Sequence, residues 1–210
     1  MKKTLRRKRS KRRQVRSVVR RKTGFRSIMR KSANLIIIAI LVWSGCDKST
    51  DPSSPTSGTI TVSSRVVNFQ STGFSFTRGS VIVFPNPQGL LPDLMVLVQI
   101  DERGSIIGVF FSPPGPPRPT FRLLGQFSTL DTAQTYYQAL SQILDTAYAD
   151  LAIPARSGQI WAVKTRENKY AKILIRNTVA FADSSTSSAP TPYGEATFDW
   201  TFQPNGTRQF

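Results

Sequence analysis

The sequence predicts a mainly β (α+β) domain, an antiparallel sheet with one amphipathic helix, behind an N-terminal signal peptide and a flexible tether. Three observations lead to this prediction. Short β-branched segments separated by turn residues recur from residue 59 onwards. Only residues 129–147 repeat apolar side chains convincingly at helical spacing. Residues 195–202 alternate strictly between apolar and polar side chains, as a half-buried antiparallel strand does.

The most informative stretch for location is an apolar run, residues 35–43, that follows a basic leader and precedes Ser44, Gly45 and the only cysteine, Cys46. The run is far shorter than the roughly 20 residues needed to cross a bilayer, and its layout is typical of a secretory signal peptide. Residues 42–46 resemble the lipobox of bacterial lipoproteins. That resemblance implies cleavage between Gly45 and Cys46, lipid (palmitate-type acyl chains) on Cys46, and a mature domain held at a membrane of the bacterial cell envelope, outside the cytoplasm.

Two other interpretations of Cys46 are a buried structural cysteine and an uncleaved membrane anchor. Residues 47–58 are polar and rich in Ser, Thr and Pro, a composition that forms a solvated tether rather than a core. The lipidated interpretation is therefore favoured. It divides the chain into a leader and signal peptide (1–45), a lipid-anchored disordered tether (46–58) and a single β-rich domain (59–210).

The net charge of +17 is concentrated in the leader. Residues 1–31 carry 16 of the 29 Lys and Arg and no acidic residue, which leaves 13 basic against 12 acidic side chains in the rest. The mature domain is thus nearly neutral, and we expect it not to bind nucleic acid.

The leader is longer than an ordinary n-region. Residues 29–46, beginning at Met29, form a complete lipoprotein signal by themselves, so we hypothesise that translation starts at Met29. The alternatives are a long n-region and an RNA-binding arm.

The first half of the domain reads as short strands. Segments 59–62, 65–69, 74–76 and 80–84 are β-branched or aromatic, and Pro and Gly at 85–89 predict a turn. The nearly continuous apolar run 94–100 predicts a strand covered on both faces, paired with 105–111 through a turn at 101–104. Met95, within this run, is expected in the core. The proline-rich stretch 112–119 cannot join a ladder and predicts a rigid loop.

The predicted helix 129–147 begins with a capping-box pattern at residues 128–131, with Asp131 in the position usual for Glu or Gln. Its apolar residues share one face, which we expect to pack on the sheet: Leu130, Ala133, Tyr137, Leu140, Leu144 and Ala147.

The C-terminal part gives the clearest strand pattern. Segments 159–165 and 169–176 predict a hairpin, 182–192 a polar loop, and 195–202 a strand with Ala196, Phe198, Trp200 and Phe202 on one face. If that strand pairs with 169–176, Glu195 and Asp199 are expected to face Lys172 and Arg176. A turn at 203–206 would then lead to a final edge strand at 207–210.

The chain contains no histidine, which removes the commonest general base and metal ligand. With one cysteine, no internal disulfide is expected. Acidic residues occur in Asp101–Glu102 and as Asp145 with Asp150, but turns and surface positions explain them better than a convergent catalytic pair. The sequence therefore predicts no catalytic residues, no metal site and no cofactor.

Residues 73–76, 159–176 and 196–206 resemble the corresponding segments of HmuY-like haem-binding lipoproteins. This resemblance covers about the last third of the chain and implies a β-rich antiparallel domain displayed at a bacterial membrane. Haem binding does not carry over, because the chain lacks histidine and Met95 is the only thioether after Cys46.

These observations predict a membrane-anchored envelope lipoprotein with a non-catalytic binding or structural module of unknown ligand. The alternative is a hydrolase-like envelope enzyme that uses only carboxylate and hydroxyl side chains.

Overall fold

A computed structural model describes residues 54–185 and 190–210. This part of the chain folds mainly into antiparallel β-sheets with one helix, which confirms the predicted fold class. The elements are β1 (Ser57–Ser63), β2 (Val66–Val67), β3 (Gln70–Ser75), β4 (Ser80–Phe84), β5 (Met95–Ile100), β6 (Ile106–Ser112), β7 (Phe121–Gln126), α1 (Leu130–Ala139), β8 (Gln159–Lys164), β9 (Tyr170–Asp183) and β10 (Thr191–Gln203).

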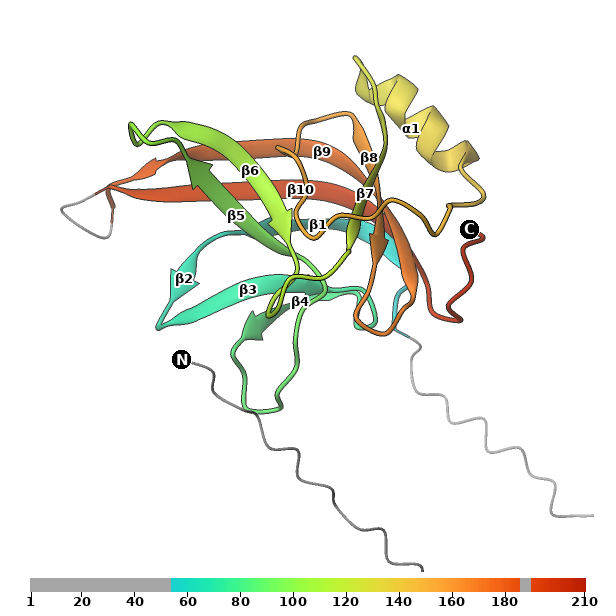
Figure 1. Ribbon diagram of the computed structural model, residues 1–210, viewed down its shortest axis with the longest axis horizontal. Coiled ribbons are helices and arrows are strands. Elements are labelled where there is room, and N and C mark those ends of the chain that lie inside the picture. The colour runs from blue at the N-terminus through green and yellow to red at the C-terminus, as the bar shows by residue number, and fades with distance from the viewer. Residues whose placement is uncertain (1–53, 186–189) are drawn as a thin grey trace, which may run out of the picture. The chain divides into compact units, whose positions relative to one another are not determined.

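The strands form a five-stranded sheet in the order β1-β10-β9-β8-β7, a three-stranded sheet β2-β3-β4 and a two-stranded sheet β5-β6. Figure 1 shows the long strands β9 and β10 running through the middle of the fold, with α1 beside β7 and β8. The two small sheets meet where Phe74 of β3 forms an isolated bridge with Leu94, just before β5. They share the main core with one face of the large sheet.

The main core is rich in aromatic rings, and the predicted apolar face of the last strand lies within it. Phe74 contacts the rings of Phe198 and Trp200 at centroid distances of 5.7 and 5.1 Å. Fully or almost fully buried members of this cluster are Val62, Phe74, Phe76, Val96, Phe111, Phe121, Ile173, Ile175, Phe198, Trp200 and Phe202. The strict alternation of residues 195–202 therefore predicted the correct face.

The opposite face of the large sheet is covered by α1 and by the chain that follows it. Ala133 and Tyr137 of α1 are buried against Ile160 and Leu174. Lys172 is only 5% exposed, and its Nζ donates to the carbonyl oxygens of Tyr137 (2.8 Å) and Leu140 (2.7 Å). A cation at this position satisfies carbonyl groups that the last helical turn leaves free.

The helix prediction was correct in its position and wrong in its length. The N-cap is Thr129, whose hydroxyl accepts from the backbone of Thr132, and α1 ends at Ala139 rather than at residue 147. Residues beyond the helix cover strand edges: Ala149 pairs with Phe121 of β7. Just past the helix, Ile143 donates its backbone N–H to Arg208 and Ser141 accepts from Phe210, so the backbone after Ala139 pairs with the C-terminal segment instead of continuing the helix.

The strands before α1 differ from the prediction in several places. β3 begins at Gln70, four residues before the predicted segment 74–76, and ends at Ser75. Ser57 and Gly58 belong to β1, so the sheet begins two residues before the predicted start of the domain at residue 59. The expected strand 65–69 is limited to β2, because Asn68 and Phe69 have φ of 52° and 62° and form the turn into β3. β7 was not predicted, since a register shift between Leu123 and Gly125 breaks the alternation.

The β5–β6 hairpin and its turn are confirmed, but β5 is not covered on both faces. Leu97 is 37% and Ile100 48% exposed. Met95 is half-buried and lines a surface groove instead of the core. The stretch 112–119 contains no strand beyond its first residue, Ser112, as its prolines require.

The C-terminal hairpin β8–β9 is confirmed, while β9 and β10 are longer than expected and include the two ends of the predicted 182–192 loop, residues 182–183 and 191–192. Arg176 binds Asp199 at 2.6 Å, as predicted. Lys172 and Glu195 do not face each other, because Thr201 lies opposite Lys172 and Glu195 lies opposite Val179. A bulge beside Thr197 shifts the register by one residue between these two pairs. Residues 207–210 form no strand, only a bridge between Gln209 and Gln142, although the turn at 203–206 is present.

Candidate binding groove

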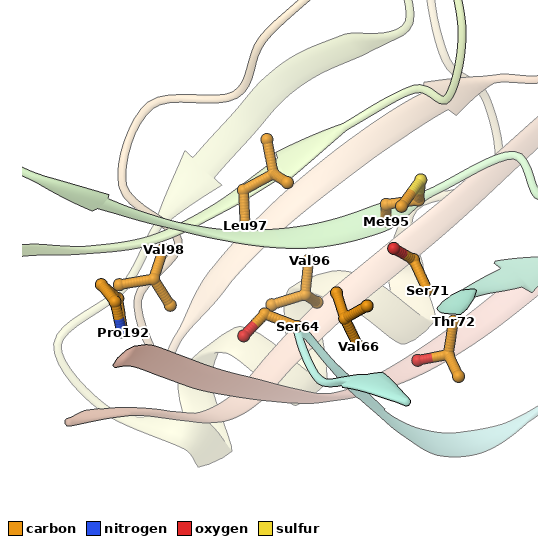
Figure 2. Close-up of a pocket in the computed structure, with 9 residues that line it drawn as sticks. All are labelled: Ser64, Val66, Ser71, Thr72, Met95, Val96, Leu97, Val98 and Pro192. Atoms are coloured by element: carbon orange, nitrogen blue, oxygen red, sulfur yellow. The ribbon is translucent and has the colours of Figure 1, made fainter. Parts of the chain in front are cut away.

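A groove opens between β5 and the corner formed by the end of β1, β2 and β3. Its volume is about 280 Å³. In Figure 2, β5 crosses above the groove, and the side chains of Val66 and Ser71 point toward it from the opposite side. The lining combines apolar side chains with three hydroxyls and consists of Ser64, Val66, Ser71, Thr72, Met95, Val96, Leu97, Val98 and Pro192.

Two hydrogen bonds fix the wall of the groove that lies opposite β5. Thr72 donates its hydroxyl to the carbonyl oxygen of Ser63 at 3.1 Å, and the Ser64 hydroxyl accepts from the backbone N–H of Gly194 at 2.9 Å. These bonds fix the corner at the end of β1 against β10. Val66, on this wall, is 60% exposed, so an apolar surface faces solvent beside the groove.

A second hollow of about 530 Å³ adjoins the groove and shares Ser64, Val66 and Pro192 with it. Arg65 binds Asp183 at 3.6 Å, and its guanidinium carbon lies 5.1 Å from the centre of the Tyr193 ring. The Tyr193 hydroxyl donates to Glu195.

Two pKa values in this hollow are shifted. Burial, followed by the bond to Glu195, raises the pKa of the Tyr193 hydroxyl. Hydrogen bonds from Ser185, with Arg65 nearby, lower the pKa of Asp183. Tyr193 therefore stays neutral and Asp183 ionised near neutral pH, so the groove ends in fixed polar groups on the β9–β10 side.

A separate polar cluster surrounds Asp93, which is 6% exposed. Its carboxylate accepts from the backbone N–H groups of Phe76 (3.0 Å) and Arg166 (3.4 Å). Burial raises the pKa of Asp93, while the two backbone hydrogen bonds and the Arg118 charge partly oppose the rise. Because both oxygens already hold the β3–β4 and β8–β9 turns together, this carboxylate acts as a structural brace rather than as an acid or base for the predicted alternative enzyme.

Other residues singled out in the sequence have structural surroundings. Asp101 accepts from Arg103 and Ser105 within the β5–β6 turn, and Asp145 binds Lys164 at 3.1 Å. Gly45 and Cys46, the predicted cleavage and lipidation residues, and Met29 lie outside the described residues. Sequence reasoning missed the groove, since its lining comes from several segments and no local pattern joins them.

Within residues 54–185 and 190–210, no group of His, Cys, Asp and Glu is arranged to hold a metal ion. No helix in the same ranges has the length and apolar character to cross a membrane. No family model, curated protein or solved structure matches the chain. The likeness to HmuY-like lipoproteins therefore stays a prediction.

Proposed function

We propose that this protein is a bacterial envelope lipoprotein, anchored to a membrane through lipid on Cys46, whose β domain is a non-catalytic binding module. The observation that carries the proposal is the order of basic residues, the apolar run 35–43, and Ser44-Gly45-Cys46. Neither a nucleic acid nor a cofactor is part of the proposed function.

The position of the groove supports the proposal of a membrane-anchored binding module. Only the short polar segment 47–56 separates Cys46 from β1, which begins at Ser57. The groove lies beyond the other end of β1, at Ser64, about 20 Å away at roughly 3.3 Å per strand residue. A domain tethered before Ser57 therefore carries its groove at a distance from the point of attachment.

The anchor is tested by replacing Cys46 with Ser and labelling cells with radioactive palmitate. We expect Cys46→Ser to lose the label and to leave the membrane fraction or accumulate as precursor. Ser49→Ala, in the same polar segment, is the matched control and should be labelled like the original protein. Undiminished labelling of Cys46→Ser would refute the lipoprotein proposal.

The start-site hypothesis has its own test. A version that begins at Met29 should be exported and lipidated like the full chain, because residues 30–46 supply the charge, the apolar run and the cleavage site. Retention of the shorter version in the cytoplasm, as judged by fractionation and intact mass, would show that residues 1–28 are required.

A further inference from the structure

The two edges of the β5–β6 hairpin differ in their backbone hydrogen bonding to the rest of the fold. On the β6 side, the carbonyl oxygens of Val109 and Phe111 accept from Ala155 (2.7 Å) and Ala152 (3.1 Å). The chain after α1 therefore covers the outer edge of β6. On the β5 side, the edge faces the groove described above.

The bonds on β6 determine which groups of β5 face the groove. In an antiparallel pair, a residue whose backbone groups point away from the partner strand stands opposite one that does the same. Phe111 pairs with Val96 and Val109 pairs with Val98. Since Phe111 and Val109 bind outwards, the N–H and C=O groups of Val96 and Val98 point outwards on the other edge of the hairpin. Within the described ranges these groups have no backbone partner.

We propose that the groove binds an extended polypeptide segment of a partner protein, which adds to β5 as a further strand. This inference rests on the proposed function of the domain as a binding module and names the chemistry of its ligand. Val96 and Val98 present their outward groups two residues apart, about 6.6 Å, which is the repeat of a strand. Addition of a strand to an open sheet edge is a general mode of peptide recognition.

The lining selects a peptide over other occupants. An acyl chain would fill the apolar surface of Met95, Leu97 and Pro192 but leave the outward amide groups of β5 without partners. A peptide strand satisfies those groups and can place alternate side chains against the wall formed by Val66. Natural sheets usually cover or charge such edges, and no charged residue lies within β5, Met95–Ile100.

The probe is a random heptapeptide library displayed on phage, selected against the full chain purified from membranes in mild detergent. The strongest binder is synthesised together with variants that carry a single N-methyl group at each amide in turn. We expect alternation: methylation at every second amide should raise Kd about tenfold or more, as loss of one well-made hydrogen bond does, and the amides between should change it little. Hydrogen exchange at Val96 and Val98 should slow when the peptide is bound.

Matched protein variants locate the site. Val66→Arg places a long charged side chain on the groove wall at a position that is 60% exposed, and it should reduce affinity at least tenfold. Val83→Arg, at a 42% exposed position of β4 outside the groove lining, should bind like the original protein. Because both sites are exposed, both variants are expected to fold.

Three results would overturn the inference: no peptide is enriched, methylation has no alternating effect, or binding survives Val66→Arg. Displacement of the peptide by a fatty acid together with uniform methylation effects would assign the groove to an acyl chain instead. Intact mass of the same preparation reports lipid on Cys46, so a failure of the anchor proposal is read separately from a failure of peptide binding.

Discussion

The two ends of β10 lie in contrasting surroundings. At the closed end, where β1 begins and β10 finishes, Phe76 and Phe202 are at most 3% exposed and their rings stack at 6.1 Å. At the open end, where β10 begins, Phe181 is 44% exposed on β9 and Phe69 is 97% exposed on the β2–β3 turn. Both ends hold aromatic residues, but only the closed end buries them.

The difference follows from how many elements meet at each end. At the closed end, the carboxylate of Asp93 joins the β3–β4 and β8–β9 turns, and Phe202 donates its backbone N–H to Thr56. At the open end, the β2–β3 turn, the β5–β6 hairpin and the β9–β10 hairpin extend away from the closed end (Figure 1), and the Arg65–Asp183 ion pair that links β9 to the start of β2 has a half-exposed arginine. Binding surfaces are commonly drawn from the less stable parts of a fold, which suits the groove at the open end.

The largest expected effect is at the aromatic core. Phe198 is fully buried and contacts the rings of Phe74 and Phe111, so Phe198→Ala should lower the free energy of unfolding by about 3–5 kcal/mol. Urea denaturation measures this. Phe69→Ala, the matched control at the open end, should change stability by less than about 0.5 kcal/mol. Equal losses in the two variants would remove the distinction between the ends.

The next effect tests how closely the β5–β6 hairpin lies on β10. A Cβ atom at Gly194 would stand 2.5 Å from a methyl group of Val98 and 3.1 Å from one of Val109. Gly194→Val should therefore cost about 1–3 kcal/mol through overpacking and shift the hairpin away from β10. Gly58→Ala, whose nearest neighbour would be 3.3 Å away, should cost less in the same denaturation assay. A neutral Gly194→Val would mean that the two layers do not pack closely.

A smaller change, this time a gain in the free energy of unfolding, is expected from a substitution in the β2–β3 turn. Phe69 has a φ of 62°, a left-handed conformation that is unfavourable for a bulky residue but ordinary for glycine. Asn-Gly is the preferred pair for a two-residue turn of this kind, so Phe69→Gly should raise the free energy of unfolding by about 0.5–1 kcal/mol. A loss of stability would show that the exposed ring makes contacts that favour folding.

The smallest expected effect is on the pH dependence of stability, through Asp93 at the closed end. Burial raises the pKa of Asp93 above 3.8, so between pH 3.8 and the raised value the folded protein holds more protons than the unfolded chain. The contribution of this group to stability must therefore fall as the pH rises through that window. Asp93→Asn, which cannot titrate, should lack this fall when denaturation curves are measured at several pH values. Parallel pH profiles for the two proteins would contradict the assignment.

Much of the large sheet could be predicted from local patterns. The alternation of Ala196, Phe198, Trp200 and Phe202 determined the buried face of β10, because side chains on a strand point to opposite faces in turn. The β8–β9 hairpin followed from its two β-rich segments and the turn between them. The predicted lipobox at Cys46 also rests on a local pattern, which is why a site of attachment can be proposed without any knowledge of the fold.

The end of α1, the register of β9 and β10 and the groove were decided by tertiary structure. Apolar spacing continues past Ala139, yet the backbone there binds the C-terminal residues 208–210 and, from Ala149 onwards, β7 and β6, because distant segments compete for the same hydrogen-bonding groups. The register of β9 and β10 places Thr201, and no acidic residue, opposite Lys172, and that lysine binds the carbonyl groups at the end of α1. The groove needs β5 and β2 on opposite walls, and their proximity is set by packing between segments far apart in the sequence, which no local pattern encodes.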